Sequence, residues 1–182
     1  EALRRDRRAF ELSSKQMDAV TKLVIVEGGR GCKDPRLNRK FVGKDAPVIA
    51  RGAGLDVPPG TVLLWSDVPN DHPMVWTEQL MPVLPVTAVR DMDAALDLAE
   101  ASEGGNHHTA AMYSMDVGNL TRMARRMACS IYVKNAPTYY GLGMGEGYAT
   151  MSIGTPTGDG LTKATHFVRP LHCSLVGYFR IA

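Results

Sequence analysis

The sequence is poor in the features that define several large protein classes. Only three of its 182 residues are cysteines, Cys32, Cys129 and Cys173, and none forms a Cys-x-x-Cys pair. So few scattered cysteines exclude a disulfide framework, disfavour structural zinc and favour a reducing, cytosolic compartment. No apolar run approaches the roughly 20 residues that a membrane-spanning helix needs. We therefore expect no membrane partner.

Signals for bound metals and phosphates are also scarce. The five histidines show no His-Glu-x-x-His or other metal-ligand spacing. A Walker Gly-Lys-Ser/Thr motif is absent, and in the glycine-rich stretch at 141–147 the sixth place falls on Glu146 or Tyr148, so Gly-x-Gly-x-x-Gly fails. We interpret that stretch as a flexible turn, with a backbone nest for phosphate as the weaker alternative. We expect no metal site.

Charge is unevenly distributed along the chain. Residues 1–44 carry twelve Lys and Arg against six Asp and Glu, whereas residues 45–182 carry nine against thirteen. A basic segment of this kind can meet nucleic acid or nucleotide phosphates, but here only Phe10 and Phe41 interleave with the basic residues. We interpret the segment as a solvated face and expect no nucleic-acid partner.

The first third of the sequence predicts two helices separated by a loop. Ser13 to Val26 has the pattern of a helix with a serine cap, and the glycines and proline that follow favour a loop. A short amphipathic helix is predicted around Ala46 to Ala53, closed by Gly54.

From residue 61 the pattern becomes regular and alternates between strands and helices. Buried strands are predicted at 61–65, 82–89, 109–114 and 129–135, with helices from Asp91 to Ser102 and from Asp116 to Met127. Strand, helix, strand, helix, strand over 82–135 is the signature of right-handed crossovers in a parallel sheet. The sequence therefore predicts an α/β fold with a mostly parallel sheet and crossover helices.

The C-terminal end differs in character from this alternating region. Residues 166–182 have a strand-like pattern with no helix to accompany it. A strand of this kind lies at an edge and invites pairing with a second chain. We expect residues 1–165 to form the main domain and residues 166–182 to act as an oligomerisation arm.

Two polar residues stand beside the predicted strands. His108 comes directly before the strand at 109–114, where an imidazole can act as a base near neutral pH. Glu78 precedes the strand at 82–89, so in a parallel sheet it lies at the same edge as His108 and can accept ribose hydroxyls. From the pattern alone, a loop histidine bonded to the main chain and an exposed loop glutamate are the commoner explanations.

Several long stretches carry a family resemblance. They are VGKDAPVIARGAGLDVPPGTVLL (42–64), HPMVWTEQLMPVLPV (72–86), EGGNHHTAAMYS (103–114), SIYVKNAPTYYGLGMGEGYATMSIGTPTGDGLT (130–162) and HFVRPLHCSLVGYFRIA (166–182). In order and spacing they resemble the CoA-acylating aldehyde dehydrogenases, specifically the acetaldehyde and propionaldehyde enzymes associated with bacterial microcompartments.

The resemblance implies a reaction and a set of site residues. A cysteine thiolate attacks an aldehyde, hydride passes to NAD, and coenzyme A resolves the thioester to acyl-CoA. By this resemblance Glu78 holds the nicotinamide ribose, and Leu80 stands where many relatives carry an aromatic residue. His108 matches a histidine placed to activate the CoA thiol, and Asn135, Tyr139 and Tyr140 correspond to the segment lining the aldehyde tunnel.

The resemblance also implies what this chain lacks. In the family, the catalytic cysteine and the Rossmann half that binds NAD come before the helix matched here by residues 1–12, and none of the three cysteines matches the nucleophile. Because the chain begins with Glu1, we expect a C-terminal fragment, inactive alone, of a homo-oligomeric enzyme (dimer or tetramer). From the resemblance we expect that enzyme in the cytoplasm, either dissolved there or enclosed within a bacterial microcompartment. The alternative is a stand-alone α/β nucleotide-binding or assembly module without catalysis.

Overall fold

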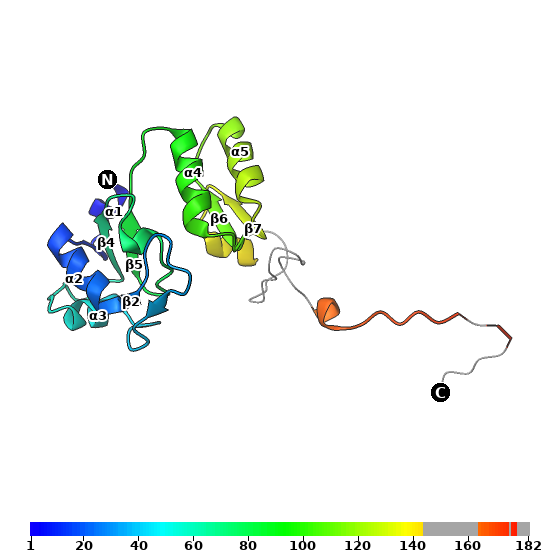
Figure 1. Cartoon of the computed structure of the whole chain (residues 1–182), viewed down its shortest axis with the longest axis horizontal. Helices are drawn as coiled ribbons and strands as arrows, with labels where there is room; N and C mark the ends of the chain where they lie inside the picture. The colour runs from blue at the N-terminus through cyan, green and yellow to red at the C-terminus, as the bar shows by residue number, and fades with distance from the viewer. Residues whose placement is uncertain (144–163, 175, 178–182) are drawn as a thin grey trace. The chain divides into compact units, whose positions relative to one another are not determined.

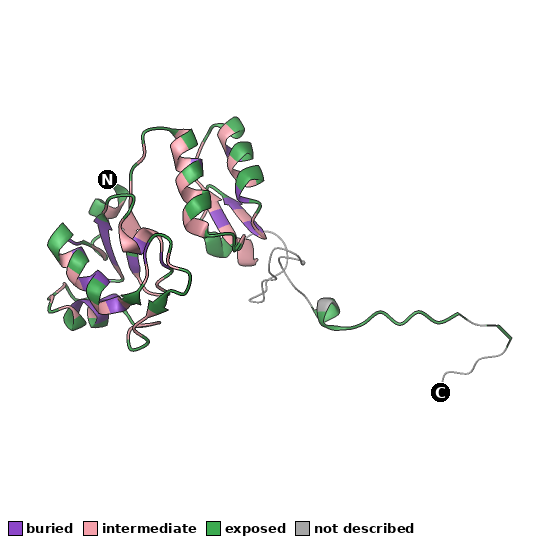
Figure 2. Ribbon diagram, in the orientation of Figure 1, coloured by how far each residue is buried: buried purple, intermediate pink, exposed green. Residues whose placement is uncertain are grey.

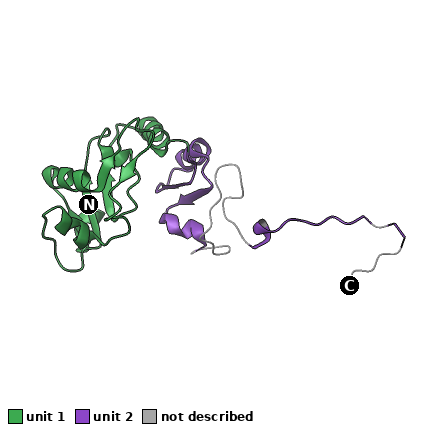
Figure 3. Ribbon diagram, turned by 60° about the horizontal axis from the view of Figure 1, so that its bottom comes forward, with its two compact units in different colours: residues 1–105 green, residues 106–182 purple. Residues whose placement is uncertain are grey.

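The computed structural model describes residues 1–143, 164–174 and 176–177 (Figure 1). The chain divides into two compact units, residues 1–105 and residues 106–182 (Figure 3). Each unit is described by itself below. Residues 144–147 of the glycine-rich stretch lie outside the described residues, so the flexible-turn interpretation there stays a prediction.

A parallel sheet forms the centre of unit 1. Strands β1 (Ala9–Glu11), β4 (Leu63–Asp67) and β5 (Val83–Val86) are hydrogen-bonded in the order β1-β4-β5. The central strand has three consecutive buried residues, as expected of a strand covered on both faces. The strands predicted at 61–65 and 82–89 are confirmed with shorter or shifted bounds. The helix matched to residues 1–12 is confirmed only over Ala2–Arg5, because Asp6 takes an extended conformation and Ala9–Glu11 pair with β4 as β1.

The helical elements of unit 1 are α1 (Ala2–Arg5), α2 (Ser14–Val24), α3 (Ala46–Gly52), the 3₁₀ turn η1 (Pro73–Val75) and α4 (Met92–Glu103). Of these, α2, α3 and η1 supply most of the core around the sheet. The buried cluster of unit 1 combines α2 and α3 with the strands, as the purple segments of Figure 2 show, and consists of Leu12, Met17, Val20, Val24, Ala46, Ile49, Ala50, Leu64, Met74 and Val83. The amphipathic helix predicted around Ala46 to Ala53 is therefore confirmed, and its apolar face forms the core together with that of α2.

The start of α2 shows how the sequence sets a helix boundary. The Ser13 hydroxyl accepts a hydrogen bond from the Gln16 main-chain N–H, and the Gln16 side chain accepts one from the Ser13 N–H at 2.8 Å. This reciprocal capping box satisfies two of the donors that a helix start leaves unpaired. The predicted serine cap is confirmed. The helix ends at Val24, before the predicted Val26, because Ile25 takes an extended conformation.

A small antiparallel hairpin follows α2 in unit 1. Strands β2 (Ile25–Glu27) and β3 (Arg36–Leu37) pair with a register shift, and Arg36 and Glu27 form an ion pair at 2.5 Å. The predicted loop is therefore the connection between two short strands. Its glycines and proline hide the strands from pattern analysis, because the alternation on each side lasts only two or three residues.

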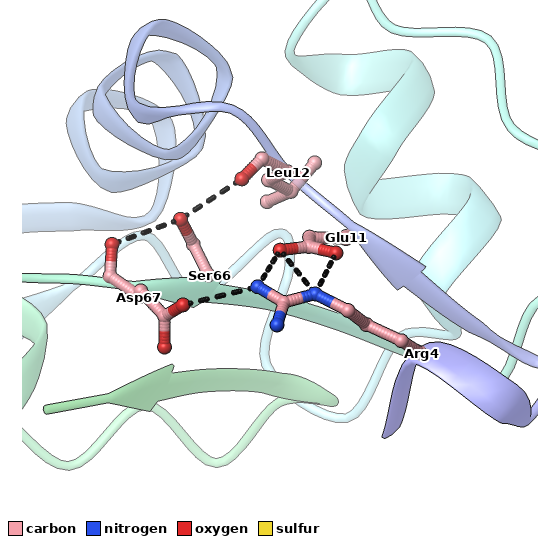
Figure 4. A network of polar contacts seen from close by, with 5 residues as sticks. All are labelled: Arg4, Glu11, Leu12, Ser66 and Asp67. Atoms are coloured by element: carbon pink, nitrogen blue, oxygen red, sulfur yellow. Dashed lines mark hydrogen bonds and ion pairs between the residues drawn. The ribbon is translucent and has the colours of Figure 1, made fainter. Parts of the chain in front are cut away.

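Arginines near the N-terminus are paired with carboxylates of the same unit. Arg4 donates to Glu11 at 2.6 Å and to Asp67 at 3.3 Å (Figure 4). Its guanidinium also lies 5.3 Å from the centre of the Trp65 ring. Arg8 pairs with Asp6 at 2.8 Å. This self-pairing supports the interpretation of the segment as a solvated face.

Unit 2 is built on a second parallel pair. Strands β6 (Thr109–Met112) and β7 (Ile131–Lys134) flank helix α5 (Val117–Met127), which Asp116 caps by accepting from the Asn119 N–H at 2.9 Å. The 3₁₀ turns η2 (Thr138–Leu142) and η3 (Ala164–Phe167) follow. The strands and helix predicted over 109–135 are confirmed, and the α/β class with them.

The predicted order of strand, helix, strand, helix and strand over 82–135 is confirmed, and the strands of each unit pair in parallel. Among the described residues β5 pairs only with β4, and β6 pairs only with β7. The carbonyls of Pro82 and Val86 face β4, so Val83 and Pro85 face the other edge of β5. Pro85 has no N–H, and the Val83 N–H donates to Met81 instead. That edge therefore offers acceptors but no free donor at these two positions.

The predicted C-terminal strand takes no regular form in the described part of the chain. Residues 164–167 form η3, and residues 168–174 have neither helix nor strand. A strand that pairs with a second chain forms only when that chain is present. The oligomerisation arm at 166–182 therefore stays a prediction. Among the described residues no helix is long and apolar enough to cross a bilayer.

Candidate functional site

The segment that carries Glu78 joins η1 to β5 in unit 1. Glu78 is exposed, and Leu80, two residues later, is 59% exposed with a φ of 53°. A leucine in the left-handed region is uncommon and costs backbone energy, so its surroundings must hold it there. The backbone of this segment is therefore held in a defined conformation by the residues around it.

Four hydrogen bonds hold this segment in place. Thr77 is only 4% exposed, and its Oγ1 accepts a hydrogen bond from the Gly29 N–H at 2.8 Å. The Gln79 side-chain amide donates to the carbonyl of Met74 at 2.6 Å and to the carbonyl of Thr77. The Leu80 carbonyl accepts from the Gly43 N–H at 3.1 Å. Thr77 and Leu80 are thus fixed by partners distant in sequence, and Gln79 is fixed by residues just before it.

Leu80 lies where two open grooves of unit 1 meet. One groove is lined by the hairpin and the residues after it: Val26, Asp34, Pro35, Arg36, Leu37, Arg39 and Val42, together with Leu80. The other is lined by Leu80 with residues 43–47, 60–62 and 81–82. An exposed aliphatic side chain beside an exposed carboxylate can contact a flat ring while the carboxylate accepts hydroxyls.

In unit 2, His108 stands at the amino end of β6. Its ring Nδ1 lies 2.6 Å from the Thr109 hydroxyl, and its main-chain carbonyl accepts from the Ile131 N–H at 3.2 Å. The neighbouring His107 ring lies 2.7 Å from the Met127 carbonyl. The His107 ring therefore contacts the main chain, and His108 is an exposed imidazole beside a hydroxyl.

Asn135 lies at the opposite, carboxyl end of the β6–β7 pair. Its φ is 53°, and its side-chain amide donates to the Ser114 carbonyl at 2.9 Å and accepts from the Ser114 N–H at 2.7 Å. Both polar atoms of the amide therefore bind main chain. A role of Asn135 at a substrate tunnel stays a prediction, and it would act there through the loop that it holds.

Tyr139 and Tyr140 form an exposed aromatic pair in η2. Their ring centroids are 5.0 Å apart with the planes tilted by 32°, and the residues are 50% and 43% exposed. A Cβ at Gly141 would overlap the side chain of Ile131 at the start of β7. Because only glycine permits this approach, η2 folds back against β7 and holds the tyrosine pair beside it.

The predicted site residues therefore fall into two groups. Glu78 and Leu80 belong to unit 1, whereas His108, Asn135, Tyr139 and Tyr140 belong to unit 2. The predicted meeting of Glu78 and His108 stays a prediction. No group of three metal-ligating side chains occurs in the described ranges, and the three cysteines there form no disulfide.

Pattern analysis missed the contacts that hold Glu78. Thr77 was not singled out, nor was Gly29, although the two residues are joined by a buried hydrogen bond across 48 positions. The local signals were a threonine next to a glutamate and a Gly-Gly pair after a helix. Nothing in either pattern indicates that the two segments touch.

Comparison with known proteins identifies the family. The aldehyde dehydrogenase family model matches residues 50–165, a range that includes all six predicted site residues. The chain belongs to the aldehyde dehydrogenase family. The resemblance drawn from the sequence motifs is confirmed at this level.

Relatives of this aldehyde dehydrogenase chain include CoA-acylating enzymes. It is 47% identical to the acetylating acetaldehyde dehydrogenase EutE of Salmonella typhimurium over 92% of its length. The Rhodopseudomonas palustris propionaldehyde dehydrogenase, solved with bound CoA and an acylated cysteine, is 39% identical over 88% of the chain with a TM-score of 0.78. A propionaldehyde dehydrogenase from a Clostridium phytofermentans fucose utilisation microcompartment is 33% identical over 91%, with a TM-score of 0.81.

These matches cover most of this chain but only about a third of each relative. The chain spans 35% of the EutE sequence, 36% of the Rhodopseudomonas chain and 37% of the Clostridium chain. These structures confirm the α/β fold of the matched region.

Proposed function

We propose that this chain is the C-terminal catalytic-domain portion of a CoA-acylating aldehyde dehydrogenase that converts a short aldehyde, acetaldehyde or propionaldehyde, to its acyl-CoA. The observation that carries the proposal is the 47% identity to an acetylating acetaldehyde dehydrogenase over 92% of the chain. The overall reaction consumes aldehyde, CoA and NAD and yields acyl-CoA, NADH and a proton.

NAD is the proposed hydride acceptor. Glu78 fits the ribose of this cofactor, because its exposed carboxylate has no hydrogen-bond or ion-pair partner in the described residues and its backbone is fixed on both sides. Carboxylate oxygens accept the two hydroxyls of a ribose. The Leu80 side chain would contact the nicotinamide ring of the cofactor. When bound, the nicotinamide accepts the hydride.

A cysteine thiolate must supply the covalent chemistry. The thiolate would attack the aldehyde carbon, and loss of hydride from that carbon would leave a thioester. The acyl group of this thioester would then pass to the CoA sulfur, with release of the cysteine thiolate and of the CoA thiol proton. By the family resemblance, none of Cys32, Cys129 and Cys173 corresponds to that nucleophile. We therefore propose that the nucleophile lies outside these 182 residues. His108, an exposed imidazole beside a hydroxyl, is the proposed base for the CoA thiol.

A chimera tests the proposed function. The region of EutE that matches this chain is replaced by the 182 residues, and NADH formation from acetaldehyde is followed with and without CoA. CoA-dependent activity within about tenfold of EutE is expected, whereas the 182-residue chain alone is expected to form none. A folded chimera without activity would overturn the proposal and favour a nucleotide-binding or assembly module.

The assembly and location of the parent protein are also proposals. A homo-oligomer, dimer or tetramer, would form through residues 166–182, and the protein would reside in the cytoplasm, within a microcompartment in organisms that build one. The support for the latter is the microcompartment relative from Clostridium phytofermentans. Light scattering of the active chimera with and without residues 166–182 tests the arm, and an unchanged mass on deletion would refute it.

A further inference from the structure

We infer that Thr77 is a positioning residue for Glu78, and that its hydrogen bond to Gly29 sets the affinity of the enzyme for NAD. The inference rests on the proposed function, because it assigns Glu78 to the cofactor ribose. It adds a residue pair, Thr77 and Gly29, that neither the family match nor the sequence motifs point to.

The contact between the two segments leaves little freedom. Thr77 is 4% exposed and its Oγ1 accepts from the Gly29 N–H at 2.8 Å. A Cβ placed on Gly28 would lie 2.5 Å from the same oxygen, closer than real Cβ contacts allow. The turn after β2 therefore approaches Thr77 so tightly that only glycine fits at position 28, and the hydrogen bond fixes its register.

A second contact on the other side of Glu78 completes the support. The Gln79 amide donates to the carbonyls of Met74 and Thr77, which ties the segment back to η1. Glu78 itself remains exposed and has no polar partner in the described residues. Its side chain is thus free to meet a ligand while its main chain is held on both sides.

A carboxylate that binds two hydroxyls at once depends on a fixed backbone, because both of its oxygens must be placed accurately. Both oxygens must stand within about 3 Å of their donors, and a displacement of about 1 Å loses one of the two hydrogen bonds. Removal of the Thr77 acceptor leaves a buried N–H on Gly29 unpaired, which favours separation of the two segments. We therefore expect weaker NAD binding rather than a slower chemical step.

The experiment compares matched substitutions in the EutE chimera. Thr77→Val keeps the shape but removes the acceptor, and Thr77→Ser keeps the acceptor. Thr77→Val is expected to raise the KM for NAD about tenfold with kcat and the KM values for aldehyde and CoA within about twofold. Thr77→Ser is expected to restore the KM for NAD to within about twofold of the unsubstituted chimera.

A control variant separates positioning from stability. Thr21 is also a buried threonine of unit 1, and its hydroxyl donates within α2 to the Met17 carbonyl. Thr21→Val removes a buried hydroxyl contact far in sequence from Glu78 and is expected to leave the KM for NAD unchanged. If both valine variants lose activity in parallel, with all kinetic parameters affected alike, Thr77 is merely structural and the inference fails.

Two further measurements keep the inference testable if Thr77→Val does not fold. Gln79→Met removes the second support and is expected to raise the KM for NAD in the same direction. In the 182-residue chain, Thr77→Ser is expected to retain slow hydrogen exchange at the Gly29 amide. An unchanged KM for NAD in Gln79→Met, or fast exchange at the Gly29 amide, overturns the inference alone, whereas an inactive unsubstituted chimera overturns the proposed function and the inference with it.

Discussion

The side-chain amide of Asn135 exchanges two hydrogen bonds with the main chain of Ser114, at 2.7 and 2.9 Å. Those residues follow β7 and β6, so the amide continues the pairing of the two strands where the strands themselves have ended. A main chain with φ of 53° allows Asn135 to turn while its side chain takes this place, a conformation that asparagine tolerates better than most residues.

Replacement of Asn135 by alanine is expected to destabilise unit 2 by about 2 kcal/mol, because two hydrogen bonds are lost while the left-handed backbone keeps its strain. Denaturant unfolding followed by circular dichroism measures the change. Asn135→Gly also removes the hydrogen bonds, but glycine adopts a positive φ without strain. The expected loss of unfolding free energy is therefore smaller, about 1 kcal/mol. Equal stability of Asn135→Ala and the unsubstituted chain would contradict this account.

A methyl group at position 141 is expected to push η2 away from β7. Gly141→Ala places a Cβ on the Ile131 side chain, and overpacking of this kind costs about 1–3 kcal/mol. Tyrosine fluorescence should change in the same variant, since Tyr140 is adjacent. In the double variant Gly141→Ala/Ile131→Ala the overlap is relieved, so the summed costs of the single changes should exceed the measured cost. Strict additivity would show that the approach is not tight.

The capping box of α2 is expected to contribute about 1 kcal/mol to the stability of unit 1. Ser13→Ala removes the hydroxyl that accepts from the Gln16 N–H and should lower the free energy of unfolding by that amount. Ser14 is the next residue and is exposed, with no cap contact, so Ser14→Ala is the matched control with little expected change. A similar loss in both variants would assign the effect to helix composition instead of the cap.

Stability near the N-terminus is expected to fall in acid. Hydrogen bonds from Arg8 lower the pKa of Asp6 from 3.8 to about 2, and the hydrogen bond from Arg4 lowers the pKa of Glu11. A carboxylate with a depressed folded-state pKa stabilises the fold above its ordinary pKa, and this contribution is lost as the pH falls from about 4 toward 2.

Urea midpoints between about pH 5 and pH 2 measure this dependence. Asp6→Asn and Glu11→Gln should each flatten the acid slope, and added salt should reduce the difference because both carboxylates are exposed. An acid slope identical in all three proteins would show that these pairs contribute nothing to folding.

Periodicity was a sound guide to the elements whose residues alternate over long stretches. The helices ending at Ser102 and Met127 were predicted within one or two residues, because apolar positions recur along them and aspartates cap their starts. Short elements such as β1 and β2 have no such repetition. Their pairing depends on partners far along the chain, which local pattern does not encode.

The site was predicted only as a set of residues. The motifs that contain Glu78 and His108 carry the family resemblance, and the family model covers both. Their surroundings could not be predicted: nothing in the sequence near Glu78 indicates that Gly29 binds Thr77, and nothing near Asn135 indicates that its amide binds Ser114. Such contacts arise from the fold as a whole.

The position of β1 has a consequence for how unit 1 forms during synthesis. Among the described strands β1 pairs with β4, and the Ser66 hydroxyl that joins the two strands donates to a Leu12 carbonyl 54 positions earlier. As the chain leaves the ribosome, β4 becomes available to β1 only after α2, the hairpin and α3 have been made. Contacts of such high sequence separation are slow to form, so the order of events favours α2 as the early element and leaves closure of the sheet as the late step that commits unit 1 to its fold.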